Sequence, residues 1–66
     1  MKIFYGGVDY ITENGVELIA HCEESKCWSV KFGNAKLKYF NGEGSSCEAR
    51  KFMKKFASDN FEIVEV

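Results

Sequence analysis

The sequence predicts an α+β fold: a four-stranded antiparallel meander sheet, followed by one helix packed on its apolar face and a C-terminal edge strand. Two observations carry this prediction. Turn signals separate short β-rich runs up to residue 40, and an apolar period typical of a helix begins only after them. The expected elements of this single domain of residues 1–66 are strands at about 8–13, 16–23, 27–32 and 35–40, a helix at about 46–58 and a strand at about 61–66.

The three turns of the meander differ in the strength of their signals. Asn14-Gly15 is a strong hairpin signal, because both central residues of a type I′ turn need a positive φ. Gly33-Asn34 places Gly first, as a type II′ turn prefers. Between them, Glu24-Ser25 is the expected centre of a turn with weaker chemistry, since it contains neither Gly nor Asn. Ile3-Phe4-Tyr5 has the composition of a further short strand.

Two-residue loops at these turns set the register of the whole sheet, because a one-residue slip moves every side chain to the other face. Tyr10 is then expected opposite Ile19, and Cys22 opposite Cys27. The face predicted to be buried carries Val8, Tyr10, Ile19, His21, Trp28, Val30, Leu37 and Tyr39.

The helix is predicted by its start signal and by its apolar period. Ser45-x-x-Glu48 is a capping-box pattern, which satisfies two backbone donors at a helix start. Ala49, Phe52, Met53 and Phe56 then form one apolar stripe at helical spacing. The remaining faces carry Arg50, Lys51, Lys54 and Lys55.

The same register predicts the residues on the sheet face that one helix leaves open. They are Ile11, Leu18, Cys22, Cys27, Lys31, Lys36, Lys38 and Phe40. Exposed apolar patches of a few hundred Å² usually mark contact sites. The alternative is a partly covered face whose lysine stems lie over apolar neighbours.

Composition and charge narrow the class of protein. The chain has 66 residues, three cysteines and a net charge of −1. It has no apolar run long enough to span a bilayer and no basic start followed by an apolar segment, so we expect a cytoplasmic protein without membrane contact. Residues 26–58 are basic, with eight Lys and Arg against two acids, whereas both ends are acidic. This asymmetry either forms a patch that faces a partner or is neutralised when the ends fold onto the middle.

The stretch HCEESKCW contains residue types that bind metals or form disulfides, but their spacing does not match that of metal-binding motifs. His21 and Cys22 are adjacent on a strand and point to opposite faces, so no metal and no cofactor is expected. Cys22 and Cys27 are expected to be free thiols, because bridging a directly opposed pair would strain the hairpin. Cys47, in the first helical turn, has no histidine partner. Without a catalytic constellation, we do not expect an enzyme.

The segments CWSVKFGNAKLKYF and CEARKFMKKF raise the possibility of nucleic-acid binding. Together they resemble the small DNA-binding modules of the integrase N-terminal and AP2-like kind, in which a three-stranded sheet backed by a helix contacts bases from its open face. The resemblance covers about half of the chain and implies nucleic-acid contacts from Lys31, Lys36 and Lys38, with Glu48, Ala49 and Phe52 as the packing signature of the helix. The sequence departs from such modules in having no arginine on the sheet, an additional acidic hairpin and a negative net charge.

We therefore expect a small non-catalytic protein-binding domain that acts through the open sheet face. A short, aromatic-rich, mildly acidic chain of this type resembles the small inhibitors that phages and other mobile elements encode against host or defence proteins. The alternative is a nucleic-acid-binding module that uses the lysine-bearing sheet face. A homodimer formed through a sheet edge is a further expectation that the sequence leaves open.

Overall fold

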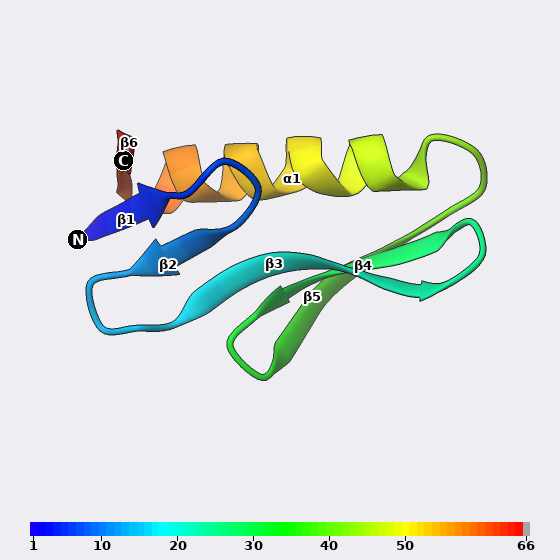
Figure 1. Ribbon diagram of the computed structural model, residues 1–66, viewed down its shortest axis with the longest axis horizontal. Helices are drawn as coiled ribbons and strands as arrows, with labels where there is room; N and C mark the ends of the chain where they lie inside the picture. Colours follow the sequence, from blue (N-terminus) through cyan, green and yellow to red (C-terminus); the bar gives the residue numbers. More distant parts are fainter. Residues whose placement is uncertain (66) are drawn as a thin grey trace.

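The computed structural model describes residues 1–65, which form a sheet of six strands with one helix along one face (Figure 1). The elements are β1 (Lys2–Tyr5), β2 (Tyr10–Thr12), β3 (Glu17–Glu24), β4 (Cys27–Phe32), β5 (Ala35–Asn41), α1 (Ser45–Asn60) and β6 (Glu62–Glu65). The strands lie in the order β5-β4-β3-β2-β1-β6. The α+β class is confirmed, and the predicted antiparallel meander is present as β2 to β5 within the larger sheet.

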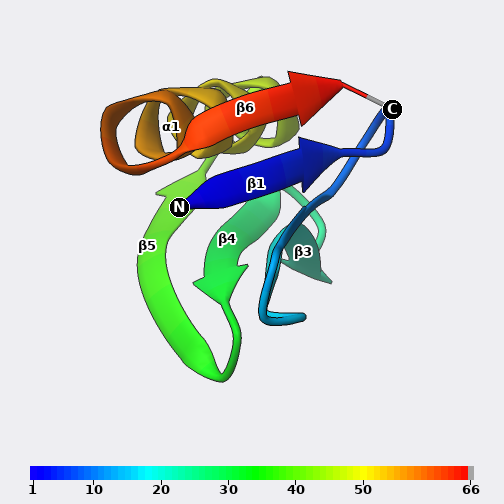
Figure 2. The ribbon, with the colours of Figure 1, turned by 90° about the vertical axis from the view of Figure 1, so that its left-hand side faces the viewer.

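The edge beyond the meander is built from the two ends of the chain. β1 pairs with β2 in an antiparallel register and with β6 in a parallel one. Figure 2 shows β6 beside β1 and next to the end of α1, because the helix carries the chain back across the sheet. The C-terminal edge strand is thus confirmed for Glu62–Glu65, and Val66, its predicted last residue, lies outside the described residues.

The first hairpin does not have the predicted register. Its loop contains three residues, Glu13 to Gly15, because the Thr12 N–H donates to the Val16 carbonyl at 2.9 Å. Gly15 adopts a left-handed φ of 85°, as the last residue of such a loop requires. Tyr10 therefore pairs with Leu18 and not with Ile19. This slip of one residue turns every side chain of the facing part of β3 to the other side of the sheet.

The second turn is also displaced. It consists of Ser25 and Lys26, with Lys26 at a φ of 57°, and the strands shift register between Cys22 and Glu24. Cys22 consequently pairs with Trp28, and Cys27 pairs with Glu24. The predicted pairing of Cys22 with Cys27 is wrong.

The third turn, Gly33-Asn34, is confirmed. Phe32 pairs with Ala35, and Gly33, with a φ of 63°, is the only one of the two turn residues with a positive φ. A bulge then shifts the register, so that Val30 pairs with Lys38 and not with Leu37. Lys38 thereby joins the face that carries Val30.

These shifts rearrange the predicted buried face. Tyr10, Val30 and Trp28 do lie on the helix-covered face and pack in or against the core. Register places three further strand residues of that prediction on the uncovered face: Ile19, His21 and Tyr39. Val8 and Leu37 are exposed.

The core lies between α1 and the sheet. Its fully buried members include Ile3, Leu18 and Val30 from the strands and Ala49, Met53 and Ala57 from the helix. The predicted helical stripe is confirmed: Phe52 and Phe56 flank the buried row, with ring centroids 5.8 Å from Phe40 and 5.5 Å from Phe32, respectively.

The start of the helix differs from the capping-box prediction. Gly44 is the N-cap, with a left-handed φ of 78° and no side-chain cap hydrogen bond. Ser45 is the first helical residue and is buried. The helix ends where the Phe61 N–H donates to the Ala57 carbonyl at 2.8 Å.

Candidate functional site

Two surfaces of the described chain carry exposed apolar or charged side chains and are candidate binding sites. One is the sheet face opposite α1, referred to below as the open face; no other element of residues 1–65 packs on it (Figures 1 and 2). The other is a groove between α1 and the connection from β1 to β2.

The residues predicted for the open face divide between the two sides of the sheet. Strand alternation and register place Ile11, Lys31 and Lys36 on the open face, with Ile11 43% exposed. Cys27 is half-buried at the start of β4. Neighbouring strand residues point to opposite faces and Trp28 faces the helix, so Cys27 lies on the open face.

The prediction placed the other four residues on the wrong face, because the first loop has three residues and two bulges shift the register. Leu18 is fully buried beneath the helix, and Phe40 packs on Phe52. The Lys38 ammonium lies 5.5 Å from the centroid of the Phe40 ring, also on the helix side. Cys22 is exposed at the end of β3, opposite Trp28.

A polar network neutralises one of the two open-face lysines. The Lys36 ammonium lies 2.8 Å from Glu23 Oε2, and the buried Ser29 hydroxyl donates to the same oxygen at 2.7 Å. These two hydrogen bonds, that from Lys36 first, lower the pKa of Glu23, and the pKa of Lys36 is raised in turn. Lys36 is therefore held by a carboxylate of its own chain.

Apolar side chains lie at several positions of the open face. Tyr39 is 51% exposed, and half-buried Phe4 and Ile19 accompany Ile11. A hollow of about 300 Å³ next to Ile11 is lined by Phe4 and Val8 together with two carboxylates, Asp9 and Glu17. The open face thus presents exposed apolar area with an acidic end.

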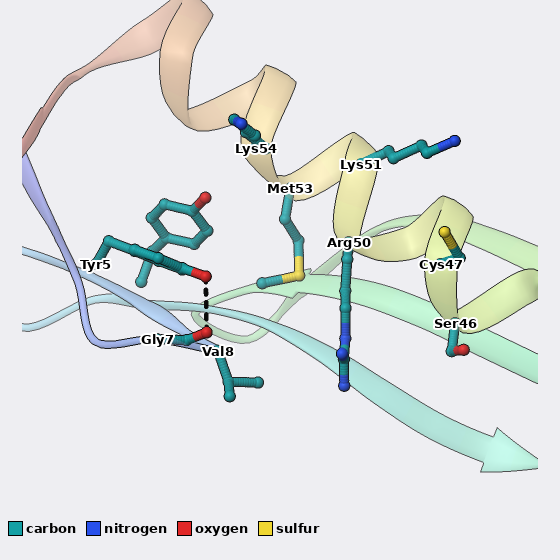
Figure 3. A pocket seen from close by; sticks show the side chains of 10 residues that line it. Tyr5, Gly7, Val8, Ser46, Cys47, Arg50, Lys51, Met53 and Lys54 are labelled. Atoms are coloured by element: carbon teal, nitrogen blue, oxygen red, sulfur yellow. Dashed lines mark hydrogen bonds between the residues drawn. The ribbon is translucent and has the colours of Figure 1, made fainter. Parts of the chain in front are cut away.

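The groove between α1 and the β1–β2 connection has the opposite charge. Its volume is about 370 Å³, and its charged lining residues are Arg50, Lys51 and Lys54 (Figure 3). Tyr5 and Tyr10 also line it, with ring centroids 4.8 Å apart. The Tyr5 hydroxyl donates to the Gly7 carbonyl at 2.6 Å, which ties the connection to the sheet.

Sequence reasoning identified the helical cations but not the groove. The spacing of Arg50 and Lys54, one helical turn apart, was the available signal. The opposite wall comes from residues 5 to 10, far away in the chain, and only tertiary structure brings them beside the helix.

The cysteines and the histidine do not converge on a common site. All three cysteines are free thiols, and strand alternation places Cys22 and Cys27 on opposite faces. His21 is exposed opposite Ser29, which corrects the prediction that it packs inward beside Trp28. Among residues 1–65, no group of three or more His, Cys, Asp or Glu side chains is arranged to hold a metal ion.

Comparison of the chain with models of protein families, with curated proteins and with solved structures finds no match. In the part of the chain that the structure describes, no helix is both long enough and apolar enough to cross a membrane.

Proposed function

We propose that this protein is a small non-catalytic protein-binding domain that acts through the open face of its sheet. The observation that carries the proposal is the uncovered face itself, where Ile11 is strongly exposed opposite Phe4. Tyr39 is strongly exposed on the far edge strand, opposite Ser29. Exposing such groups to water is unfavourable, and aromatic side chains are enriched in the cores of protein interfaces.

The charges of this face favour a protein partner over nucleic acid. Lys36 is paired with Glu23, and Lys38 lies on the helix side. Lys31 is then the remaining lysine of the predicted set, and Glu17 lies on the same face. A phosphate backbone needs several unpaired cations along its path, so binding of nucleic acid through this face has little electrostatic support.

A domain of this kind acts by occupying the surface of its partner. That mode fits an inhibitor of the type encoded by phages and other mobile elements, which blocks a host or defence protein without chemistry of its own. The acidic hollow beside Ile11, with Asp9 and Glu17, suits a basic side chain of the partner that flanks an apolar one.

A charge-matched pair of variants tests the proposal. Ile11→Asp/Tyr39→Asp places two negative charges on the open face, whereas Lys55→Gln/Ser58→Asp changes the net charge equally on the outer side of α1. Protein captured from the native host by the wild type is identified by mass spectrometry, and its affinity for each variant is measured by calorimetry. We expect the open-face variant to bind at least about tenfold more weakly at an unchanged melting temperature, and the helix variant to bind like the wild type.

Three outcomes contradict the proposal. One is a partner that binds the open-face variant as well as it binds the wild type. Another is the absence of any protein that the wild type captures and the open-face variant does not. The third is submicromolar binding of DNA with a steep salt dependence that a Lys31→Glu/Lys36→Glu variant abolishes. A dimer in sedimentation that the open-face variant dissociates identifies the partner as a second copy of this chain.

A further inference from the structure

The groove beside α1 gathers positive charge, and no acidic side chain lines it. Its lining contains Arg50, Lys51 and Lys54 but no Asp or Glu. The salt bridges within residues 1–65 involve Lys26, Lys36 and Lys55, so none of them uses a groove cation. In a chain with a net charge of −1, this is a local concentration of unpaired cations.

All the cations of the groove come from α1. Arg50 and Lys54 are one helical turn apart on the flank of α1 that faces the β1–β2 connection. Figure 3 shows Arg50 extending from the helix toward the strands, whereas Lys54 stays beside the helix and Lys51 points away from both. A guanidinium presents a planar fork of donors that matches two oxygens of a phosphate group.

A second, independent feature is the Tyr10 hydroxyl. Tyr10 is only 6% exposed and lines the groove, yet its hydroxyl takes part in no hydrogen bond within residues 1–65. No fully buried side-chain nitrogen or oxygen of the described chain lacks a partner, so this hydroxyl is accessible from one of the hollows that Tyr10 lines, the groove among them. The phenol of Tyr10 is a protonated donor at neutral pH, as in any tyrosine, and burial, followed by Tyr5 and Glu65, raises its pKa further.

We propose that this groove binds the phosphate monoester of a small organic molecule of about nucleotide size. Arg50 contacts the phosphate oxygens, Lys54 adds to the positive potential of the groove, and the Tyr10 hydroxyl donates a further hydrogen bond to the ligand. Met53 and Val8 supply an apolar wall for the organic part. The volume of about 370 Å³ lies at the lower end of the range for small-molecule sites.

The distribution of charge favours a small ligand over a nucleic-acid strand. Glu65 lies beside Tyr5 and Lys54 in an adjoining hollow, and Asp9 lies in the hollow on the other side of Val8. A strand that passes beyond the groove would meet these carboxylates, whereas a single phosphate contacts only the cations. Beyond roughly 8–10 Å, salt screens the groove charges from a longer polyanion.

Titrations followed by amide NMR shifts test this site at low ionic strength. The probes are inorganic phosphate, adenosine 5′-monophosphate and uncharged adenosine. We expect the monophosphate to shift amides of residues 5–10 and 46–54, inorganic phosphate to shift the same amides more weakly, and adenosine to have no effect. Arg50→Gln/Lys54→Gln should weaken binding of the monophosphate by about tenfold or more, because charge-assisted hydrogen bonds are lost.

Two further variants separate a specific site from general attraction. Lys55→Gln removes a charge from the same helix outside the groove and should leave the affinity within about twofold. Tyr10→Phe keeps the ring and removes the hydroxyl, which has no hydrogen-bond partner within residues 1–65. We expect a twofold to tenfold loss of affinity, about the contribution of one hydrogen bond, and no loss of stability.

Four results overturn the proposal: no shifts with either phosphate probe, shifts that lie outside the groove, an equal loss of affinity in Lys55→Gln and Arg50→Gln/Lys54→Gln, or equal binding of adenosine and its monophosphate. Binding of an eight-nucleotide single strand much tighter than the monophosphate also overturns it, in favour of a nucleic-acid partner. Because the groove lies on the opposite side of the sheet from Ile11 and Tyr39, the Ile11→Asp/Tyr39→Asp variant should bind the monophosphate normally.

Discussion

Leu18 and Ile19 are neighbours on β3 in opposite surroundings. Leu18 is fully buried between the sheet and α1, whereas Ile19 is half-buried on the open face. Their side chains are similar in size, so a difference in stability between their alanine variants reflects the difference in burial between the two positions. The register of the first hairpin decides which of the two belongs to the core.

We therefore expect Leu18→Ala to lower the free energy of unfolding by about 2–5 kcal/mol, because it removes buried methyl groups and leaves a cavity. Ile19→Ala should cost about 1 kcal/mol or less. Urea titrations followed by the fluorescence of Trp28 measure both. A larger loss for Ile19→Ala than for Leu18→Ala would show that the strands pair in the two-residue-loop register.

The pH dependence of folding stability provides a second prediction for a single residue, Glu23. Its pKa is lowered in the folded protein by the hydrogen bonds from Lys36 and Ser29. A carboxyl with a lowered folded pKa stabilises the fold fully above its ordinary pKa of 4.5, and this contribution is lost as the pH falls through the folded value.

Unfolding midpoints in urea at about pH 6 and about pH 3 measure this effect. Glu23→Gln should reduce the stability lost on acidification relative to the wild type. Lys36→Gln should reduce it as well, since Lys36 is the main cause of the shift. An acid sensitivity in Glu23→Gln equal to that of the wild type would assign the acid response to other carboxyls.

Two glycines determine the hairpins at the scale of elements. Gly15 and Gly33 both have a left-handed φ, of 85° and 63°. A side chain at Gly15 would meet nothing within 4 Å, whereas a Cβ at Gly33 would lie 3.2 Å from Val16 Cγ1. The two sites therefore separate backbone strain from steric conflict.

Gly15→Ala should cost about 1 kcal/mol, the strain of a non-glycine residue in the left-handed region. Gly33→Ala should cost more, because the contact with Val16 is added. Gly15→Asn is the control and should be milder than Gly15→Ala, since Asn tolerates this conformation. Thermal unfolding of the three variants checks the order, and a neutral Gly15→Ala would contradict the three-residue loop.

At the scale of the whole molecule, the sheet separates surfaces of different character. The open face carries exposed apolar side chains and an acidic end, and the helix side carries the cationic groove. The charge asymmetry along the chain is resolved in both of the ways that the sequence allowed. Lys36 from the basic middle is neutralised by Glu23 from the acidic first part, whereas Arg50, Lys51 and Lys54 remain together without partners in residues 1–65.

The sequence by itself determined the elements of this protein and their order. The α+β class, the Gly33-Asn34 turn, the helical stripe through Met53 and the last strand depend on local signals, which act within a few residues. Of the predicted contact residues, Ile11, Lys31 and Lys36 lie on the open face, as does Cys27 at its end.

Only the tertiary structure decided which side chains face the helix. Large apolar residues stand next to each other as Leu18-Ile19 and as Tyr39-Phe40, so either register buries an apolar row. A loop of two or of three residues uses Gly15 equally well, and the difference of one residue inverts the face of a whole strand. Packing beneath α1 distinguishes the registers, and the same long-range folding places Tyr5 and Tyr10 beside Arg50 and Lys54 to form the groove.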